Sequence, residues 1–572
     1  MKKTFLLSCL MLAAMPVMAA YTGHVYVDKN KNGVFDQSEK PLAGIKVSDG
    51  LNVVETAADG SFTLPGHERE RFIFITTPSG YKTFNRHYHK IEKKQSGYDF
   101  GLIPYSGRIR KNGSHRYIHI ADTEIFNTEN HADWVNNVRD YARNEQAAFI
   151  IHTGDICYEK GLKAHIKLMN TENMDCPVFY CIGNHDLVKG KYGEELFESI
   201  YGPVYYSFDA GNVHYVVTPM PGGDHAPGYT SDDVCRWLKN DLAHIRPGTP
   251  VVVFNHDLLT YEDTFIFKSK NAGSINLNEY NLKAWVYGHW HINYMKKQGD
   301  VYSVCTSSLD KGGIDHSTTA FRVMHVDSKG DFTSELRYTY LDKNICIASP
   351  AGVMASGVLP VAVNVYSSVS PVREVLYTCL ADGKPVLKNK RLLQSTDWSW
   401  NGELPLSHKY VGKELTLRVT ARFNNGEIAE AESNFICRTE KAVPLFSADW
   451  DNLSGNAKHS APVSAPLNLP LQLAWTNNVG ANLYMTSPLI HKGKVIVASV
   501  DEDLKGAGHV YALNGKDGTI LWSCPVRNSI KNSIAVDSDI VFAQDAQGFL
   551  YAIDTETGKL CWEKQLPVNG LP

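Results

Sequence analysis

Five short polar clusters between residues 118 and 291 carry side chains that could hold metal ions. Each follows an apolar run, and they read Asp122-Thr123-Glu124, Gly154-Asp155, Gly183-Asn184-His185-Asp186, Asn255-His256-Asp257 and Gly288-His289-Trp290-His291. Carboxylate, amide and imidazole groups together suit divalent ions such as Mn, Fe, Zn or Mg. One such histidine is more often a core residue than a ligand, and one such aspartate more often caps a helix. Five clusters of such donors in one segment are candidate ligands of a metal site.

The apolar runs in front of these clusters predict the strands that position them. They cover residues 117–121, 149–152, 178–182, 251–254 and 284–287, with amphipathic segments such as 131–146 and 231–244 between them. This alternation over residues 107–338 is typical of an α/β domain. Because α/β sheets bind ligands at the carboxyl ends of neighbouring strands, the clusters should converge on one crevice. Gly154, Gly183 and Gly288 would let the backbone turn sharply there.

The order of the clusters resembles that of the calcineurin-like metallophosphoesterase family, over roughly residues 115–325. The resemblance implies a four-layer α/β core that binds two divalent metal ions. It implies that Asp155 bridges the ions, that the first ion also takes Asp122, Glu124 and His291, and that the second takes Asn184, His256 and His289. It further implies that His185 is the general acid and that Asp186 orients it.

The same resemblance implies a reaction. A hydroxide held between the two ions would attack the phosphorus of a phosphomonoester, a phosphodiester or a pyrophosphate, and His185 would protonate the departing oxygen. The chain departs from the family at Glu124, because the first motif is usually Asp-x-His. A carboxylate there would favour Mn or Mg, or would leave that ion only partly bound. The sequence contains no Gly-x-Ser-x-Gly elbow and no P-loop.

The alternative interpretation is a non-catalytic extracytoplasmic binding protein with a vestigial metal site, whose β domains bind a glycan or a cell-surface ligand. Glu124 is the only feature that favours it. The intact Asn184, His185 and His289-Trp290-His291 argue against it, because a decayed site should have lost more than one position.

The segment 219–229 leaves two interpretations open. It could be a substrate-facing loop that brings Asp224, His225 and Tyr229 near the cleft, or it could be an ordinary Gly/Pro surface loop.

Composition bounds the architecture and the compartment. The 572 residues predict about three to five domains, and the net charge of −4 gives no argument for nucleic-acid or membrane binding. Lys2, Lys3, an apolar run and Val17-Met18-Ala19 predict a signal peptide over residues 1–20, hence export to the periplasm or the cell exterior. Ten cysteines remain after cleavage, and an even number in an oxidising compartment permits disulfides.

Short alternating runs separated by Gly and Asp turns predict a β-sandwich over residues 21–106. Its loop 28–39 places oxygen donors in the EF-hand calcium pattern, at Asp28, Asn30, Asn32, Asp36 and Glu39, with Gly33 at the sixth position. The flanking helices of an EF-hand are missing. The loop therefore predicts one structural calcium ion between two strands, and the alternative is an Asn-Gly turn with acids there by chance.

The last part of the chain returns to strand-like alternation. Residues 339–440 predict an immunoglobulin-like sandwich, and the polar stretch 441–468 predicts a linker. Residues 469–572 contain a repeat with an offset of 40 residues, in which Tyr511 and Trp522 correspond to Tyr551 and Trp562. It resembles the blades of quinoprotein-like (PQQ-like) β-propellers, which does not imply the quinone. Two blades make only an incomplete propeller. We expect catalysis not to depend on residues 441–572.

Overall fold

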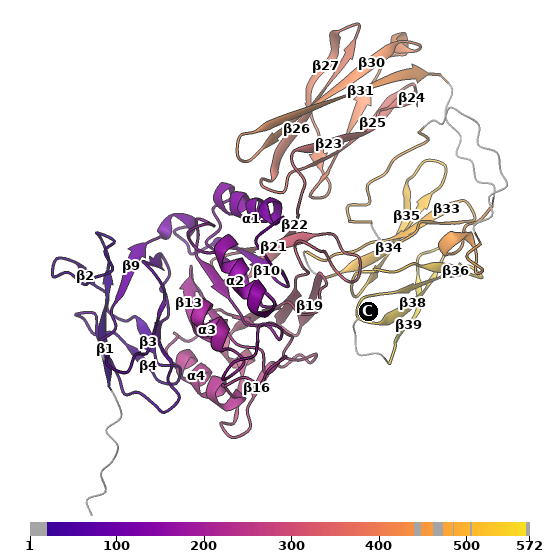
Figure 1. The fold of residues 1–572 in the computed structure, drawn as a ribbon. Coiled ribbons are helices and arrows are strands. Elements are labelled where there is room, and N and C mark those ends of the chain that lie inside the picture. The colour runs from indigo at the N-terminus through magenta and orange to yellow at the C-terminus, as the bar shows by residue number, and fades with distance from the viewer. Residues whose placement is uncertain are drawn as a thin grey trace, which may run out of the picture.

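The computed structural model describes residues 20–95, 97–439, 448–460, 473–483, 486–503 and 506–567. Residues 1–19 of the predicted signal peptide and most of the predicted linker lie outside these residues. The described chain is mixed α/β, as predicted, and it is rich in strands with few helices (Figure 1). None of its helices is long and apolar enough to cross a membrane. The ten described cysteines are all free thiols.

The N-terminal domain consists of two sheets around one apolar core. The strands are β1 (Tyr21–Val27), β2 (Lys40–Pro41), β3 (Lys46–Ser48), β4 (Val53–Glu55), β5 (Ser61–Leu64), β6 (Phe72–Ile75), β7 (Tyr81–Thr83), β8 (Tyr88–Lys90) and β9 (Phe100–Pro104). One sheet has the order β2-β1-β9-β7, with β5 also paired to β1, and the other has the order β4-β3-β6-β8. Val25 and Phe100 from the first sheet meet Val47 and Ile73 from the second in the shared core.

The central domain holds the polar clusters and contains two larger sheets. The first, in the order β12-β11-β10-β21-β22, comprises β10 (His115–Ile120), β11 (Phe149–His152), β12 (Val178–Tyr180), β21 (Ala320–Val326) and β22 (Phe332–Tyr338). The second, in the order β13-β14-β15-β18-β20-β19, comprises β13 (Tyr206–Ala210), β14 (Val213–Val217), β15 (Val251–Phe254), β18 (Leu282–Tyr287), β19 (Tyr294–Gln298) and β20 (Val301–Cys305). A short hairpin of β16 (Ile266–Lys268) and β17 (Ser274–Asn276) lies outside both.

The two central sheets pack face to face through aromatic rings. Tyr117 and Phe149 of the first sheet contact Tyr215 and Phe254 of the second, with ring centroids 5.0–6.4 Å apart. Four helices accompany the sheets: α1 (Ala132–Asn144), α2 (Tyr158–Leu168), α3 (Glu195–Tyr201) and α4 (Ser231–Ala243). Helices α1 to α3 share a core with the first sheet, and α4 packs mainly into the core of the second. Burial on both faces explains why the central strands read as continuous apolar runs.

The third domain again has two sheets around one core. Its strands are β23 (Asn344–Ser349), β24 (Gly352–Ala355), β25 (Val358–Tyr366), β26 (Val372–Ala381), β27 (Lys384–Arg391), β28 (Leu393–Gln394), β29 (Ser399–Pro405), β30 (Glu414–Phe423) and β31 (Ile428–Arg438). The sheets have the orders β23-β25-β29-β28 and β24-β31-β30-β26-β27. Val363 and Trp400 of one sheet and Val375 and Leu417 of the other are buried together.

The C-terminal repeats form two antiparallel sheets of four strands in sequence order. They are β32 (Leu489–His491), β33 (Lys494–Ala498), β34 (Gly508–Asn514) and β35 (Ile520–Val526), then β36 (Ala535–Asp537), β37 (Ile540–Gln544), β38 (Phe549–Asp554) and β39 (Leu560–Gln565). The same tryptophan–glycine contact occurs twice in these repeats. The Trp475 ring covers Gly518, and the Trp522 ring covers Gly558, where any Cβ would lie within 2.6 Å of the indole.

The C-terminal sheets lie beside the central domain and are joined to it by buried polar contacts (Figure 1). Lys531 Nζ lies 2.6 Å from Asp315 Oδ2 and donates to the Asn293 carbonyl oxygen at 2.6 Å. Asn528 Nδ2 donates to the Met295 carbonyl oxygen at 3.1 Å. This junction reaches the segment that directly follows the polar cluster 288–291, so it counts against the expectation that catalysis does not depend on residues 441–572.

Candidate metal centre

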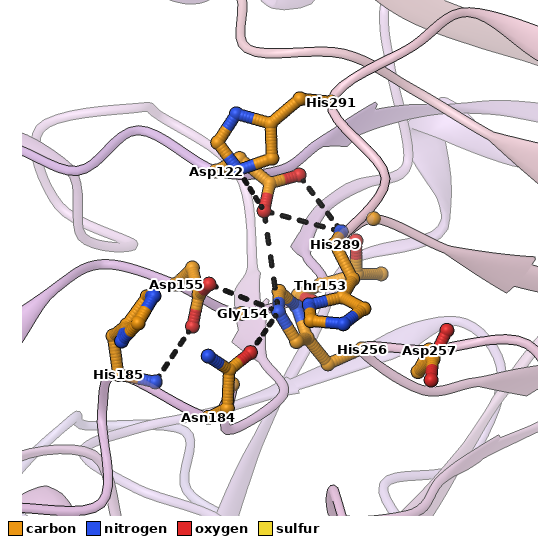
Figure 2. Close-up of polar contacts among 12 residues, drawn as sticks. Asp122, Thr153, Gly154, Asp155, Asn184, His185, His256, Asp257, His289 and His291 are labelled. Carbon is orange, nitrogen blue, oxygen red and sulfur yellow. Dashed lines mark hydrogen bonds and ion pairs between the residues drawn. The ribbon is translucent and has the colours of Figure 1, made fainter. Parts of the chain in front are cut away.

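The five polar clusters lie where five strands end at one edge of the two central sheets. Strands β10, β11 and β12 run parallel and lead into Asp122, Asp155 and Asn184. The parallel pair β15 and β18 leads into His256 and His289. Figure 2 shows these side chains directed toward one another.

Asp155 lies at the centre of the cluster. Its Oδ2 is 3.1 Å from His256 Nε2, and its Oδ1 accepts a hydrogen bond from the His185 backbone N–H at 3.0 Å (Figure 2). Asn184 Oδ1 also lies 3.1 Å from His256 Nε2. The other ring nitrogen of His256, Nδ1, is 2.7 Å from the Thr153 carbonyl oxygen. That contact orients the imidazole so that Nε2 faces the oxygen donors, the arrangement usual for a ligating histidine.

A second group forms around Asp122. His291 Nε2 lies 3.5 Å from Asp122 Oδ1 and 3.6 Å from Glu124 Oε1. The His289 backbone N–H donates to both carboxylate oxygens of Asp122 at 3.1 Å. Lys311 Nζ lies 2.8 Å from Glu124 Oε2. Oε1 of Glu124 therefore lies beside His291, where the resemblance puts a ligand. Oε2 of Glu124 is paired with Lys311.

The backbone at the cluster has an uncommon conformation. Five of the seven predicted ligands have a positive φ: Asp122 (52°), Glu124 (44°), Asp155 (55°), His289 (66°) and His291 (51°). This left-handed region costs a residue other than glycine roughly 1–3 kcal/mol and persists where the surrounding structure enforces it. Here the Asp122 N–H donates to the Gly154 carbonyl oxygen at 3.0 Å and the Glu124 N–H to that of Asp155 at 3.1 Å. Such strain is typical of functional sites.

The glycines of the clusters allow the ligands to approach. A Cβ on Gly183 would lie 2.2 Å from Asp155 Oδ1, and one on Gly154 would lie 2.7 Å from His256 Nδ1. A Cβ on Gly288 would lie 2.7 Å from an oxygen of Asp122. A side chain at any of the three positions would displace a predicted ligand.

Burial and charge shift the pKa values in the metal-free cluster. Burial raises the pKa of Asp122 well above its usual value. Burial acts the same way on Asp155, but the nearby His256 charge outweighs it and lowers the pKa of Asp155. Burial lowers the pKa of His256, yet Asp155 and Asp122 raise it to about 9. In the metal-free cluster His256 is therefore protonated at neutral pH, and its positive charge offsets negative charge on the buried carboxylates.

His185 is paired with a residue other than the predicted one. Its Nδ1 lies 2.9 Å from Asp224 Oδ2, and although partial burial lowers its pKa, the Asp224 hydrogen bond brings about a net rise. The contacts of Asp186 are to backbone groups, so the orienting role that the resemblance implies would be indirect. Asp186 is buried, and its two oxygens accept the backbone N–H groups of Cys157 and Gly183 at 2.8 and 2.9 Å.

The residues present fit two metal ions. Asp155, His256 and His289 bring one donor atom each within 4.8 Å of one another, and so do Asp122, Asp155 and His291. The two groups share Asp155, the residue that the resemblance makes the bridging ligand. Mixed imidazole and carboxylate donors suit divalent transition metals.

Comparisons with known proteins agree with this geometry. Residues 115–293 match the family model described as calcineurin-like phosphoesterase. The central domain is a calcineurin-like phosphoesterase domain. Residues 29–104 match the model described as N terminal of calcineurin-like phosphoesterase. Residues 472–570 match a PQQ-type repeat model described as outer membrane protein assembly factor BamB, which confirms the resemblance of the repeats.

Individual relatives are distant from this phosphoesterase-domain protein. Purple acid phosphatase 13 of Arabidopsis thaliana is 26% identical over 215 residues, which span 35% of this chain and 36% of that protein. A predicted phosphoesterase from Streptococcus pneumoniae TIGR4 is 12% identical over 40% of this chain and 98% of its own, with a TM-score of 0.19. BamB from Moraxella catarrhalis is 11% identical over 42% of this chain and 55% of its own, with a TM-score of 0.13. These two scores are too low to inform the fold.

The predicted calcium loop lies between β1 and β2. Asp28 is buried and accepts the N–H groups of Asn32 and Gly33 at 3.1 and 2.9 Å, and Asn30 Nδ2 donates to Asp36 at 2.7 Å. Glu39 accepts the Lys29 N–H at 2.8 Å. The five predicted ligands therefore gather in one loop that is already held by its own hydrogen bonds, and calcium binding stays a prediction.

Proposed function

We propose that this protein is an exported metal-dependent phosphoesterase that hydrolyses a phosphomonoester or a phosphodiester with two divalent ions. The observation that carries the proposal is the pair of donor groups that share Asp155. His185, whose pKa is raised, lies beside them. A structural role does not explain five predicted ligands of positive φ, on three loops directed at one point. The purple acid phosphatase relative supports the same reaction class.

The chain's own residues would bind the ions and move a proton. Asp122, Glu124 and His291 would hold one ion, Asn184, His256 and His289 the other, and Asp155 would contact both. When bound, such ions activate water and neutralise charge on phosphoryl oxygens.

His185 would act on the leaving group. Asp224 holds its Nδ1 at 2.9 Å and thereby favours the protonated ring. Nε2 would then give its proton to the ester oxygen as the bond to phosphorus breaks, an effect typically of about 10²–10⁴-fold. Asp186 would act indirectly, because it fixes the loop that carries His185.

Several finer features belong to the same proposal. The central sheets with their helices would form the four-layer core, and the C-terminal sheets would be blades of a partial propeller. The charged and apolar pattern of residues 1–20 supports export. A glycan or cell-surface ligand of the β domains stays a prediction.

The test combines metal analysis with turnover on one sample of the mature protein. We expect close to two ions per chain and hydrolysis of an aryl phosphate or a bis-aryl phosphate after loading with Mn, Fe, Zn or Mg. Asp155→Asn should lose both ions and activity, whereas Asp300→Asn, on a surface turn, should change neither. One ion or none, with no turnover under any metal, would favour the non-catalytic binding protein.

A further inference from the structure

Exposed aromatic rings are concentrated around the metal centre. In the described part of the chain five Phe, Tyr or Trp side chains are largely exposed: Phe126 (57%), Tyr158 (43%), Tyr261 (55%), Tyr340 (46%) and Trp562 (45%). The first three lie on loops or a helix end beside the predicted ligands. Large apolar side chains left in water next to a site commonly mark a surface that a ligand covers.

Phe126, Tyr158 and His185 form a row of rings. The Phe126 and Tyr158 centroids are 6.3 Å apart with an angle of 19° between the planes. The Tyr158 and His185 centroids are 5.3 Å apart with an angle of 42°. The row therefore leads from the proposed general acid outward to solvent, and the planes of the Phe126 and Tyr158 rings are nearly parallel.

The backbone fixes this row to the catalytic loop. The Tyr158 N–H donates to the His185 carbonyl oxygen at 3.0 Å. Asp186 links the Cys157 N–H to the Gly183 N–H, which ties the start of α2 to the loop that carries His185. The Tyr158 ring thus keeps its place relative to His185, as a preformed binding surface requires.

We propose that Phe126 and Tyr158 bind a planar ring in the leaving group of the substrate. The inference rests on the proposed function, because it takes His185 as the donor to the leaving oxygen. Because the Tyr158 ring lies 5.3 Å from the His185 ring, a leaving group protonated by His185 would have the two exposed rings within reach. Flat rings gain from stacking on aromatic faces, whereas the Asp224 carboxylate at the His185 end disfavours an additional negative charge.

A second aromatic pair provides a matched control. Tyr261 stacks on Trp290 with centroids 6.0 Å apart, and Trp290 Nε1 donates to Asp257 at 3.0 Å. Asp257 and His185 lie at opposite ends of the ligand cluster in Figure 2. Tyr261 is as exposed as Phe126 but lies away from the leaving-group side, so its removal should not affect recognition of the leaving group.

The experiment compares two esters whose alcohols are of similar acidity but differ in shape. Benzyl phosphate carries a planar ring and cyclohexylmethyl phosphate a puckered one, and the methyl diesters serve if only diesters react. We expect the metal-loaded full-length protein to show a kcat/KM about three- to tenfold higher for the benzyl ester. Phe126→Leu combined with Tyr158→Leu should bring the ratio close to one, and Tyr261→Leu should leave it unchanged.

The outcomes separate this inference from the proposed function. Equal rates for the two esters in the wild type, or a ratio that survives in the double variant, would overturn it. If neither these esters nor the aryl phosphates react, the proposed function fails. The binding of benzylphosphonate and cyclohexylmethylphosphonate then decides whether Phe126 and Tyr158 bind a planar ring, which equal affinities would overturn. A preference for a nucleoside 5′-phosphate over ribose 5-phosphate would identify the ring as a nucleobase, and a benzyl preference alone as an aromatic alcohol.

Discussion

Lys531 offers the sharpest test of how the domains depend on one another. Its side chain is only 7% exposed, and its Nζ lies 2.6 Å from Asp315 Oδ2 and 2.5 Å from Glu502 Oε1. Lys531→Met removes the ammonium that both buried carboxylates contact. Breaking a buried pair in this way typically costs about 3–5 kcal/mol. For a unit of this size each kcal/mol lowers Tm by about 2–4 °C, so we expect a loss of about 6–20 °C.

The substitution should also weaken the metal centre. Lys531 donates to the Asn293 carbonyl oxygen, two residues after His291, and the Ile314 N–H donates to the His291 carbonyl oxygen at 2.8 Å. Loss of the ammonium frees this segment, and metal should then pass more readily to a competing chelator. Thermal unfolding and chelator competition on the same preparation measure the two effects.

Two further variants decide whether the charge is the cause. Lys531→Met combined with Asp315→Asn and Glu502→Gln removes the buried negative charges as well, so it should recover most of the lost Tm. Lys492→Met removes a surface lysine that contacts Asp539 and should change nothing measurable. A triple variant as unstable as the single one, or an unchanged Lys531→Met, would refute the reasoning.

Three other predictions concern individual sites. Asp224→Asn removes the carboxylate that raises the pKa of His185, so His185 should lose its proton at a lower pH. The alkaline limb of the kcat/KM profile should therefore move to lower pH. An unmoved limb would argue against the pairing of His185 with Asp224. His256 has a pKa of about 9, raised from 6.5. Its charge therefore stabilises the metal-free fold fully below pH 6.5, and that stability is lost as the pH rises through 9. Since a ligating histidine is neutral, metal binding at pH 7–8 should release a proton, visible as a buffer-dependent heat in calorimetry; a heat independent of the buffer would contradict it. Calcium should raise the Tm of the wild type, and Asp36→Asn should reduce that rise; identical melting in calcium and in chelator would count against the loop.

The metal centre was largely predictable because its signal is local. Each predicted ligand follows a buried strand, so an apolar run and the polar residues after it indicate strand and candidate ligand together. The backbone conformation of the predicted ligands could not be predicted, because no sequence pattern at Asp122 or His291 indicates a positive φ. That conformation comes from hydrogen bonds between loops far apart in the sequence.

The partners of the predicted residues could not be found from the sequence. Asp224 lies 39 residues after His185 in the segment 219–229, for which the sequence left a substrate-facing loop as one interpretation. Its pairing with His185 depends on how the two sheets pack. Asp186 has the sequence position of an orienting group, but its oxygens satisfy backbone N–H groups instead. Lys531 lies 240 residues after His291, in a repeat whose sequence pattern predicts strands but no contact with another domain.

The contact between Lys531 and the segment after His291 has a consequence for biosynthesis. A chain is made from its N-terminus, so all seven predicted ligands emerge well before residue 531. Until then the segment 291–293 lacks the ammonium that later holds it. An ion captured early would therefore sit in an incompletely supported site and could still exchange. The ion that the finished protein keeps would be the one present when the last repeats fold, in the compartment where that happens.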